Sequence, residues 1–302
     1  MDVAIGMDVD GALEKTLERA AGLRARGFTR MWSSQIFGPD TLTVLAIVGR
    51  ENPDLDLGTA VVPIQTRHPT MLAAQARTVQ EAIGGRLSLG IGLSHKAVVE
   101  GMWGIPFDRP AHHMAEYLEI LAPLLRGEKV RVKGERVSAT TIGALGPSEV
   151  RTPGLLVAAL APKMLEMAGT LTDGTLTWMT GVKTLATHVV PTINAAAAAA
   201  GRPVPRVVCS LPISVTGNVA DTMTNVNQTL EIYGTLPSYR AMLDREGANG
   251  PADVGLFGGR EQVLEKLNDL AAAGVTEFSA AMAGNPDDRE ATYDTLLAYQ
   301  SM

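Results

Sequence analysis

Short, largely apolar runs alternate along the chain with longer segments whose apolar positions lie three and four residues apart. Continuous apolar runs are typical of parallel strands buried on both faces, and the longer segments are typical of amphipathic crossover helices. Strands are expected at 3–7, 28–34, 57–63, 86–92, 155–160, 174–179, 207–216 and 275–282. Eight such units predict an α/β fold of the (β/α)8 TIM-barrel type.

The segments between these strands carry the end signals of helices. Pro162 opens one segment in its first turn and Gly84 closes another, which is the usual asymmetry of the two residue types. Helices are expected at 11–26, 40–50, 68–84, 110–126, 162–171, 183–200 and 259–273.

Two stretches interrupt the alternation and are expected to be insertions. Residues 129–145 alternate charged and apolar positions, which predicts an exposed hairpin. Residues 218–258 are too many for one crossover and contain the turn residues Gly234, Pro237 and Gly250. They are expected to form a broken helix and a loop, as a lid over the carboxyl ends of the strands. The whole chain, 1–302, is expected to be a single domain.

Composition narrows the classes of partner. Hydrophobic residues make up 46% and charged residues 19%, which is typical of a compact globular chain. The 26 basic residues against 32 acidic ones form no basic cluster, which argues against nucleic acid. No apolar run is long enough for a membrane helix. The single cysteine, Cys209, and the lack of a signal-like start predict a cytoplasmic protein. The scattered histidines predict no metal site.

In a barrel of this type the ligand binds at the carboxyl ends of the strands, so the residues that follow each strand are the candidates. The third strand leads into a loop with the basic pair Arg67 and His68, and the fourth ends in Gly90 and Gly92. Positions without a side chain let a flat ring approach the backbone closely. A small-molecule ligand is therefore expected at these two junctions.

These junctions resemble the luciferase-like monooxygenase superfamily. The resemblance begins with GTAV (58–61), RHP (67–69) and GRLSLGIG (85–92), and it continues with GIPFDRP (104–110) and a Glu116-Tyr117 pair. Later matches are AALAPKM (158–164), Asp173-Gly174, GGREQV (258–263) and AGV (273–275). Within the superfamily, WSSQIFG (32–38) and LSHK (93–96) look like an actinobacterial subgroup of coenzyme F420-dependent oxidoreductases.

The resemblance implies a luciferase-like barrel with a cofactor at its strand ends. It implies a cis peptide bond between Ala60 and Val61, bulging against the back of the cofactor ring, and a cofactor phosphate held after strands four and five. Backbone N–H groups of a helix that starts at Pro162 would suit such an anion. The residues expected to bind the cofactor are Gln35, Ala60, Val61, Gly92, Leu93, Ser94, His95, Ala159, Leu160, Ala161, Pro162, Trp178, Met179 and Lys183.

The catalytic residues are not identified by the resemblance. Related enzymes often carry an acidic residue and a histidine after strand two, where this chain has Gln35 and Ile36. Gln35 can hydrogen-bond a ring carbonyl or a substrate oxygen but cannot exchange a proton at neutral pH. His95 is the remaining titratable candidate, as a phosphate contact, a general acid or a structural residue.

The other histidines and tryptophans have plainer interpretations. His68 is expected to make a structural contact, and His112, His113 and His188 are expected on solvated helix faces. Trp178 is either a pocket wall or an ordinary strand-end residue. Trp32 is expected in the core or in the pocket.

Three functions follow as hypotheses. The first is a coenzyme F420-dependent oxidoreductase that transfers a hydride between the deazaflavin C5 and a small organic substrate. The second is an FMN-dependent luciferase-like monooxygenase, and the third is a non-catalytic barrel that only binds the flavin or deazaflavin. A homodimer is expected, because 42–48 and 71–79 have apolar residues on more than one helical side, Val44 and Ala74 among them.

Overall fold

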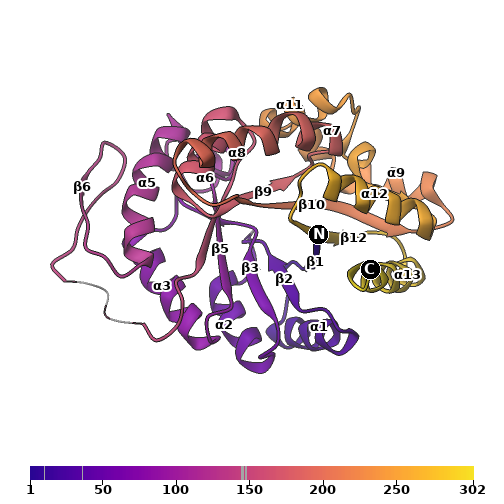
Figure 1. Cartoon of the computed structure of the whole chain (residues 1–302), viewed down its shortest axis with the longest axis horizontal. Helices are drawn as coiled ribbons and strands as arrows, with labels where there is room; N and C mark the ends of the chain where they lie inside the picture. The colour runs from indigo at the N-terminus through magenta and orange to yellow at the C-terminus, as the bar shows by residue number, and fades with distance from the viewer. Residues whose placement is uncertain (10, 36, 144–145, 147) are drawn as a thin grey trace. The chain divides into compact units, whose positions relative to one another are not determined.

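Figure 1 presents the computed structural model of the chain, which describes residues 1–9, 11–35, 37–143, 146 and 148–302. The chain forms two compact units. The N-terminal unit consists of residues 8–158 and 170–173, and the C-terminal unit consists of residues 1–7, 159–169 and 174–302. The expectation of one domain over the whole chain stays a prediction.

The N-terminal unit is a parallel sheet flanked by helices. Its strands are ordered β2 (Arg30–Ser33), β3 (Asp56–Thr59), β5 (Leu87–Gly92) and β8 (Gly154–Ala158), and β4 (Val62–Pro63) pairs with the end of β5. The helices are α1 (Leu13–Arg26), α2 (Thr41–Glu51), α3 (Pro69–Ala82), α4 (Lys96–Gly101) and α5 (Pro110–Leu125). An antiparallel hairpin, β6 (Arg131–Lys133) and β7 (Ser138–Thr140), follows α5, as predicted.

The C-terminal unit has the same construction. β10 (Arg206–Val215) pairs in parallel with β9 (Gly174–Trp178), β12 (Glu277–Met282) and β11 (Leu256–Gly258), and β12 also pairs with β1 (Asp2–Gly6). The helices are α6 (Pro162–Leu171), α7 (Val182–Thr184), α8 (Val190–Ala199), α9 (Val219–Thr229), α10 (Glu231–Thr235), α11 (Pro237–Glu246), α12 (Arg260–Ala272) and α13 (Pro286–Gln300). A π-helical segment, Leu185–Val189, joins α7 to α8, and a 3-10 turn, Pro251–Val254, precedes β11.

The eight predicted strands are all present in the described chain, each followed by helical structure, which is the strand and helix content of a (β/α)8 barrel. The core of the N-terminal unit includes Trp32, which is 3% exposed and lies over Gly58, where a Cβ atom would be only 2.2 Å from the indole. Trp32 is therefore a core residue. Within the described residues, no helix has the length and apolar character that a membrane crossing needs.

Some elements were not predicted. The stretch 218–258 contains three helices rather than one broken helix, and α13 was missed. α13 begins with a reciprocal cap, in which Asn285 accepts from the Asp288 N–H and Asp288 accepts from the Asn285 N–H. Its buried face includes Thr292 and Thr295. Because hydroxyl residues weaken the apolar periodicity, the sequence pattern did not indicate this helix.

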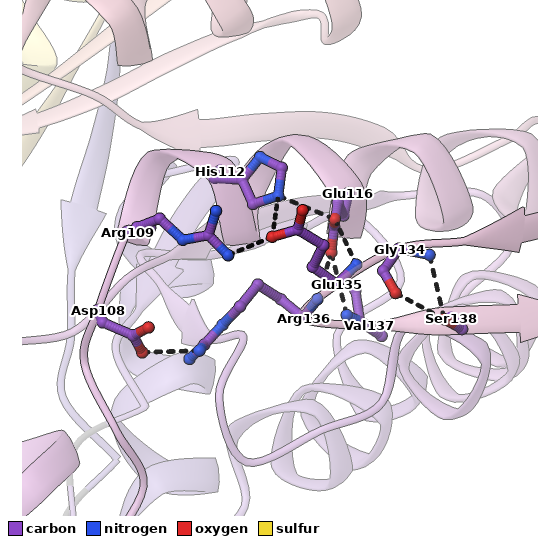
Figure 2. A network of polar contacts seen from close by, with 9 residues as sticks. All are labelled: Asp108, Arg109, His112, Glu116, Gly134, Glu135, Arg136, Val137 and Ser138. Carbon is purple, nitrogen blue, oxygen red and sulfur yellow. Dashed lines mark hydrogen bonds and ion pairs between the residues drawn. The ribbon is translucent and has the colours of Figure 1, made fainter.

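A buried carboxylate holds the β6–β7 hairpin against α5 (Figure 2). Glu116, 8% exposed, accepts hydrogen bonds from the backbone N–H groups of Glu135 at 2.7 Å, Arg136 at 2.7 Å and Val137 at 3.1 Å. His112 Nε2 lies 3.0 Å from the same carboxylate. A Cβ on Gly134 would lie 2.5 Å from the Glu116 Cδ, so this close approach requires glycine.

Ion pairs on the surface of the hairpin surround this carboxylate. Arg109 pairs with Glu135, and Arg136 Nη1 lies 2.7 Å from Asp108 Oδ1. Burial acts to raise the pKa of Glu116, but the three backbone N–H groups and His112 outweigh it, so the pKa lies below its ordinary 4.5. The carboxylate is therefore ionised at neutral pH.

We predict that Glu116→Gln loosens the hairpin. The variant keeps the size of the side chain but replaces a charged acceptor by an amide, so the free energy of unfolding should fall by roughly 2 kcal/mol. The amides of residues 135–137 should exchange hydrogen faster. Because the pKa of Glu116 is lowered by folding, its contribution is complete above about pH 5 and is lost as the pH falls through the lowered value. The difference in free energy of unfolding between the parent protein and Glu116→Gln should therefore disappear at acid pH.

Glu119→Gln, on the exposed face of the same helix, is the control and should change neither quantity. Equal behaviour of the two variants at pH 7, by urea unfolding and hydrogen exchange, would contradict the role given to Glu116.

Candidate functional site

The third strand is interrupted at its carboxyl end. Gly58 pairs with Ser88 and Val62 pairs with Ile91, so residues 59–61 face only residues 89 and 90 of β5. One residue is extra, which is a bulge. Thr59 Oγ1 accepts from the Gly90 N–H at 2.9 Å and donates to the Gly90 carbonyl at 2.8 Å, so a side chain satisfies the backbone groups that the strand no longer pairs.

The bulge contains the expected cis peptide bond between Ala60 and Val61. The end of β2 holds its backbone: the Ala60 N–H donates to the Ser33 carbonyl at 2.8 Å, and Ser34 Oγ donates to the Ala60 carbonyl at 2.9 Å. The space beside Gly92 is filled by Val61, since a Cβ on Gly92 would lie 2.5 Å from Val61 Cγ2. Gly92 therefore makes room for the bulge, and Ala60 and Val61 are left half-buried at the strand ends.

Gln35 is used within the fold. Its Oε1 accepts from the Thr41 N–H at 2.8 Å and its Nε2 donates to the Pro39 carbonyl at 3.3 Å, at the start of α2. Asp40 caps the same helix and pairs with Arg67. Ile36 lies outside the described residues. The predicted contact of Gln35 with a ligand stays a prediction, and its amide already has local partners.

The turn after β5 has an unusual backbone. Ser94 has φ 55°, in the left-handed region that side chains other than glycine rarely adopt. The carbonyl of Leu93 accepts from Gln65 Nε2 at 2.5 Å, which holds this turn from the loop after β4. His95 is half-buried, and burial lowers its pKa below the ordinary 6.5, so the imidazole is neutral at pH 7.

In the C-terminal unit, the turn from residue 159 into α6 is held by a buried histidine. His188 is 8% exposed and its Nε2 lies 2.8 Å from the Leu160 carbonyl. The prediction of a solvated His188 was wrong, because the π-helical segment turns this ring toward the protein. Ala161 and Pro162 are exposed at the start of α6, where Ala161 accepts the first helical hydrogen bonds.

Lys183 and the end of β9 belong to the same unit. The backbone N–H groups of Lys183 and Thr184 donate to the Glu246 carboxylate at 3.1 and 2.7 Å, so α11 is bound to the start of α7. The Lys183 side chain is exposed. Trp178 is half-buried, whereas Met179 is completely buried and left-handed at φ 53°.

Seven of the predicted residues belong to the N-terminal unit, at or after the ends of β2, β3 and β5: Gln35, Ala60, Val61, Gly92, Leu93, Ser94 and His95. Val61 fills the space beside Gly92, and its carbonyl accepts from the Gln35 N–H at 3.3 Å. The others, Ala159, Leu160, Ala161, Pro162, Trp178, Met179 and Lys183, lie in the C-terminal unit. The prediction that residues 93–95 and 161–162 form one anion site therefore stays a prediction.

Some of the buried polar atoms without a hydrogen-bond partner in the described chain lie at or near the carboxyl ends of strands. Ser33 Oγ and Gln65 Oε1 are such atoms in the N-terminal unit, and Trp178 Nε1 and Ser214 Oγ in the C-terminal unit. Such atoms are costly unless a ligand or water bonds them. In each unit, taken by itself, the residues present therefore fit a polar partner, with Gln65 Oε1 as an acceptor in the N-terminal unit and Trp178 Nε1 as a donor in the C-terminal unit. Gln65 was not predicted, because nothing in the local sequence indicates which side of its amide is unpaired.

Known proteins resemble this chain in sequence and in fold. Residues 2–288 match the sequence model of the family described as luciferase-like monooxygenase. A Mycobacterium tuberculosis protein, provisionally named a coenzyme F420-dependent oxidoreductase, is 30% identical over 171 residues, covering 53% of this chain and 49% of that protein.

Two solved structures match nearly the whole chain. The coenzyme F420-dependent tetrahydromethanopterin reductase from Methanopyrus kandleri has a TM-score of 0.74 at 21% identity, over 99% of this chain and 97% of its own. The oxygenating constituent of 3,6-diketocamphane monooxygenase from Pseudomonas putida, in complex with FMN, has a TM-score of 0.76 at 17% identity, over 98% and 96%. These likenesses show the fold, which is the luciferase-like (β/α)8 barrel, as predicted.

We predict that Gly92→Ala destabilises the bulge. The new Cβ would overlap Val61, whose branched side chain has little freedom to turn away, so the free energy of unfolding should fall by about 1–3 kcal/mol. Adding Val61→Ala should recover part of the loss, because the two positions are in contact.

Gly101→Ala is the matched control, since no atom lies within 4 Å of a Cβ at that position. Urea unfolding of the four proteins measures the effect, and a double variant no more stable than Gly92→Ala alone would contradict the contact.

Proposed function

The chain belongs to the luciferase-like monooxygenase family and is an oxidoreductase, and we propose that it uses coenzyme F420 to transfer a hydride between the deazaflavin C5 and a small organic substrate. The observation that carries the choice of F420 is the relative from Mycobacterium tuberculosis, which is named for that coenzyme. The name of the Methanopyrus kandleri structure supports it. The relatives named for F420 and the FMN complex together support a flavin or deazaflavin cofactor.

The residues of the N-terminal unit have roles that suit such a ring. Ala60 and Val61 would lie against its back, since both are small or apolar and half-buried at the strand ends. Gln65 Oε1 would accept a hydrogen bond from a ring N–H, because it is a buried acceptor without a partner. The bound deazaflavin itself supplies the carbon that gives or takes the hydride.

The turn at residues 93–95 would hold the cofactor phosphate. The left-handed Ser94 turns the chain sharply between β5 and α4, and turns of this kind can direct successive N–H groups toward an anion. A neutral His95 would donate one N–H, and a neighbouring phosphate would raise its pKa toward the ordinary value. Gln35 cannot supply a proton, so a proton needed by the substrate would come from water or from His95.

The alternative is an FMN-dependent monooxygenase, which the family name and the FMN complex from Pseudomonas putida favour. Reduced flavin reacts readily with oxygen and reduced deazaflavin does not, so the two functions differ in their need for oxygen. A barrel that binds the cofactor without catalysis would turn over under neither condition.

We predict that the protein binds F420 at least tenfold more tightly than FMN, and that turnover with F420 is equal with and without oxygen. Fluorescence titration measures the affinities, and absorbance of F420 follows oxidation of a panel of alcohols or reduction of carbonyl compounds and imines. Tighter binding of FMN together with oxygen-dependent turnover would support the monooxygenase instead.

We predict that Ser94→Asp weakens F420 binding by about tenfold or more, because a carboxylate would repel the phosphate at short range. Ser94→Gly is the matched variant: it permits the left-handed backbone and removes only the hydroxyl, so binding should stay within about threefold. Ser301→Asp, at the exposed end of the chain, controls for net charge. Unchanged affinity of the Ser94→Asp variant would exclude this turn from the phosphate site.

We also propose that the chain forms a homodimer through α3. Val44, expected in the interface, is 5% exposed and belongs to the core, whereas Met71 on α3 is 67% exposed. Met71→Glu should therefore give a folded monomer, measured by light scattering. A parent protein that is monomeric at high micromolar concentration would remove the proposal. A cytoplasmic location is likewise proposed, supported by the single free cysteine, Cys209.

A further inference from the structure

The indole of Trp178 carries a hydrogen-bond donor without a visible acceptor. Trp178 is the last residue of β9, and its Nε1 atom is buried and makes no hydrogen bond. Indole N–H can only donate, and a buried indole normally has an acceptor. The atom lies at the carboxyl end of a barrel strand, where ligands bind in this fold. A ligand atom that accepts a hydrogen bond would satisfy it.

Helices α10 and α11, in the stretch that was expected to form a lid, supply an aromatic wall beside this donor. The ring of Tyr233 in α10 meets Trp178 edge to face, with centroids 5.8 Å apart and planes at 81°. Tyr239 in α11 continues the series at 5.2 Å and 76° from Tyr233. Each contact is an arrangement that aromatic rings favour. These helices are thus connected to β9 by three rings within one unit.

The backbone that carries the indole is held by its neighbours, and the ring itself packs against Tyr233. Thr180 Oγ1 donates to the Trp178 carbonyl at 3.1 Å. Met179, the residue between them, is left-handed and completely buried, so the chain cannot rotate there without moving a core side chain. The donor is therefore held in place before a ligand arrives, which reduces the entropy lost on binding.

The segment that follows Trp178 already binds a carboxylate. Lys183 and Thr184 direct their N–H groups at the Glu246 carboxylate, which already occupies the positive start of α7. A second carboxylate near this segment would be repelled. Planar carbonyl compounds combine a neutral acceptor with a flat apolar body that packs on aromatic edges.

We propose that Trp178 and Tyr233 form a substrate subsite for a neutral carbonyl compound, whose oxygen accepts from Trp178 Nε1–H and whose apolar body lies against Tyr233. The proposal deepens the proposed function and rests on it for the identity of the pocket. The chemistry of the contact depends only on residues of the C-terminal unit.

Two probes of equal shape test the contact. Acetophenone has a carbonyl oxygen where α-methylstyrene has a methylene group. The full-length protein, with and without F420, should bind acetophenone about fivefold more tightly than α-methylstyrene, as one hydrogen bond provides. In protein labelled with 15N at its tryptophans, acetophenone should shift the Trp178 indole resonance and α-methylstyrene should shift it much less.

Variants distinguish the contribution of the Trp178 N–H donor from that of the Tyr233 ring. Trp178→Phe should lower the affinity for acetophenone about fivefold and leave α-methylstyrene unchanged. Tyr233→Leu should weaken both probes equally, and Trp103→Phe should change neither. The indole resonance of the parent protein tests the proposal even where a variant does not fold.

Equal affinity of the parent for both probes, or an equal loss of both in Trp178→Phe, would overturn the proposal. So would an indole resonance that acetophenone leaves in place, which would mean that water bonds the N–H. Fluorescence titration of the parent with F420 measures cofactor affinity and tests the proposed function independently of the subsite. A protein that selects acetophenone without binding F420 would refute the proposed function and keep the subsite.

Discussion

Thr59 replaces with one side chain the two backbone hydrogen bonds that β3 gives up where it leaves the sheet. A buried carbonyl and a buried N–H of Gly90 would otherwise be unsatisfied, at a cost of about 1–3 kcal/mol each. The bulge at Ala60 and Val61 is possible only because these groups are satisfied. Gly92 then provides the space into which Val61 packs, and Ser34 holds the carbonyl of Ala60 from the neighbouring strand. Hydrogen bonds and space thus come from β3, from β5 and from the residue that follows β2, and together they shape the strand ends of the N-terminal unit.

The strand pattern could be read from the sequence because buried parallel strands depend on local composition. The helices of the 218–258 stretch were expected only as one broken helix, and α13 was missed. Threonines share the buried positions of α9 and α13 with apolar residues, which weakens the apolar periodicity of these two helices. The hairpin was predicted from its alternation, but the carboxylate that holds it was not. Glu116 lies in a helix that is otherwise amphipathic, and its partners are backbone groups some twenty residues later. Because these partners are backbone N–H groups, the residue types at positions 135–137 do not indicate the contact.

The candidate site divides in the same way. Its positions follow from the rule that ligands meet the carboxyl ends of barrel strands, and the resemblance supplied the cis bond. What each side chain does there depends on partners that only the fold brings close. Gln35 has the chemistry of a ligand contact, but the start of α2 uses its amide. His188 is polar and was expected on a solvated helix face, but the π-helical segment turns its ring toward the Leu160 carbonyl. Gln65 was not expected in the site, and its one buried, unpartnered oxygen is visible only in three dimensions.

The strand ends of the two units differ in the polarity of what they leave unpaired. Each unit leaves a serine hydroxyl that can donate or accept, Ser33 or Ser214; beside it the N-terminal unit leaves an acceptor, Gln65 Oε1, and the C-terminal unit leaves an indole that can only donate. None of these groups exchanges a proton near neutral pH, and Gln35 does not either. Such groups cannot act as acids or bases, but they can orient a ring and a substrate without changing charge. Hydride transfer needs such orientation. The reacting carbon belongs to the cofactor, and the protein sets the distance and angle between cofactor and substrate. Groups at the described strand ends that orient a ligand but do not ionise are therefore suited to redox chemistry in which a cofactor carries the electrons.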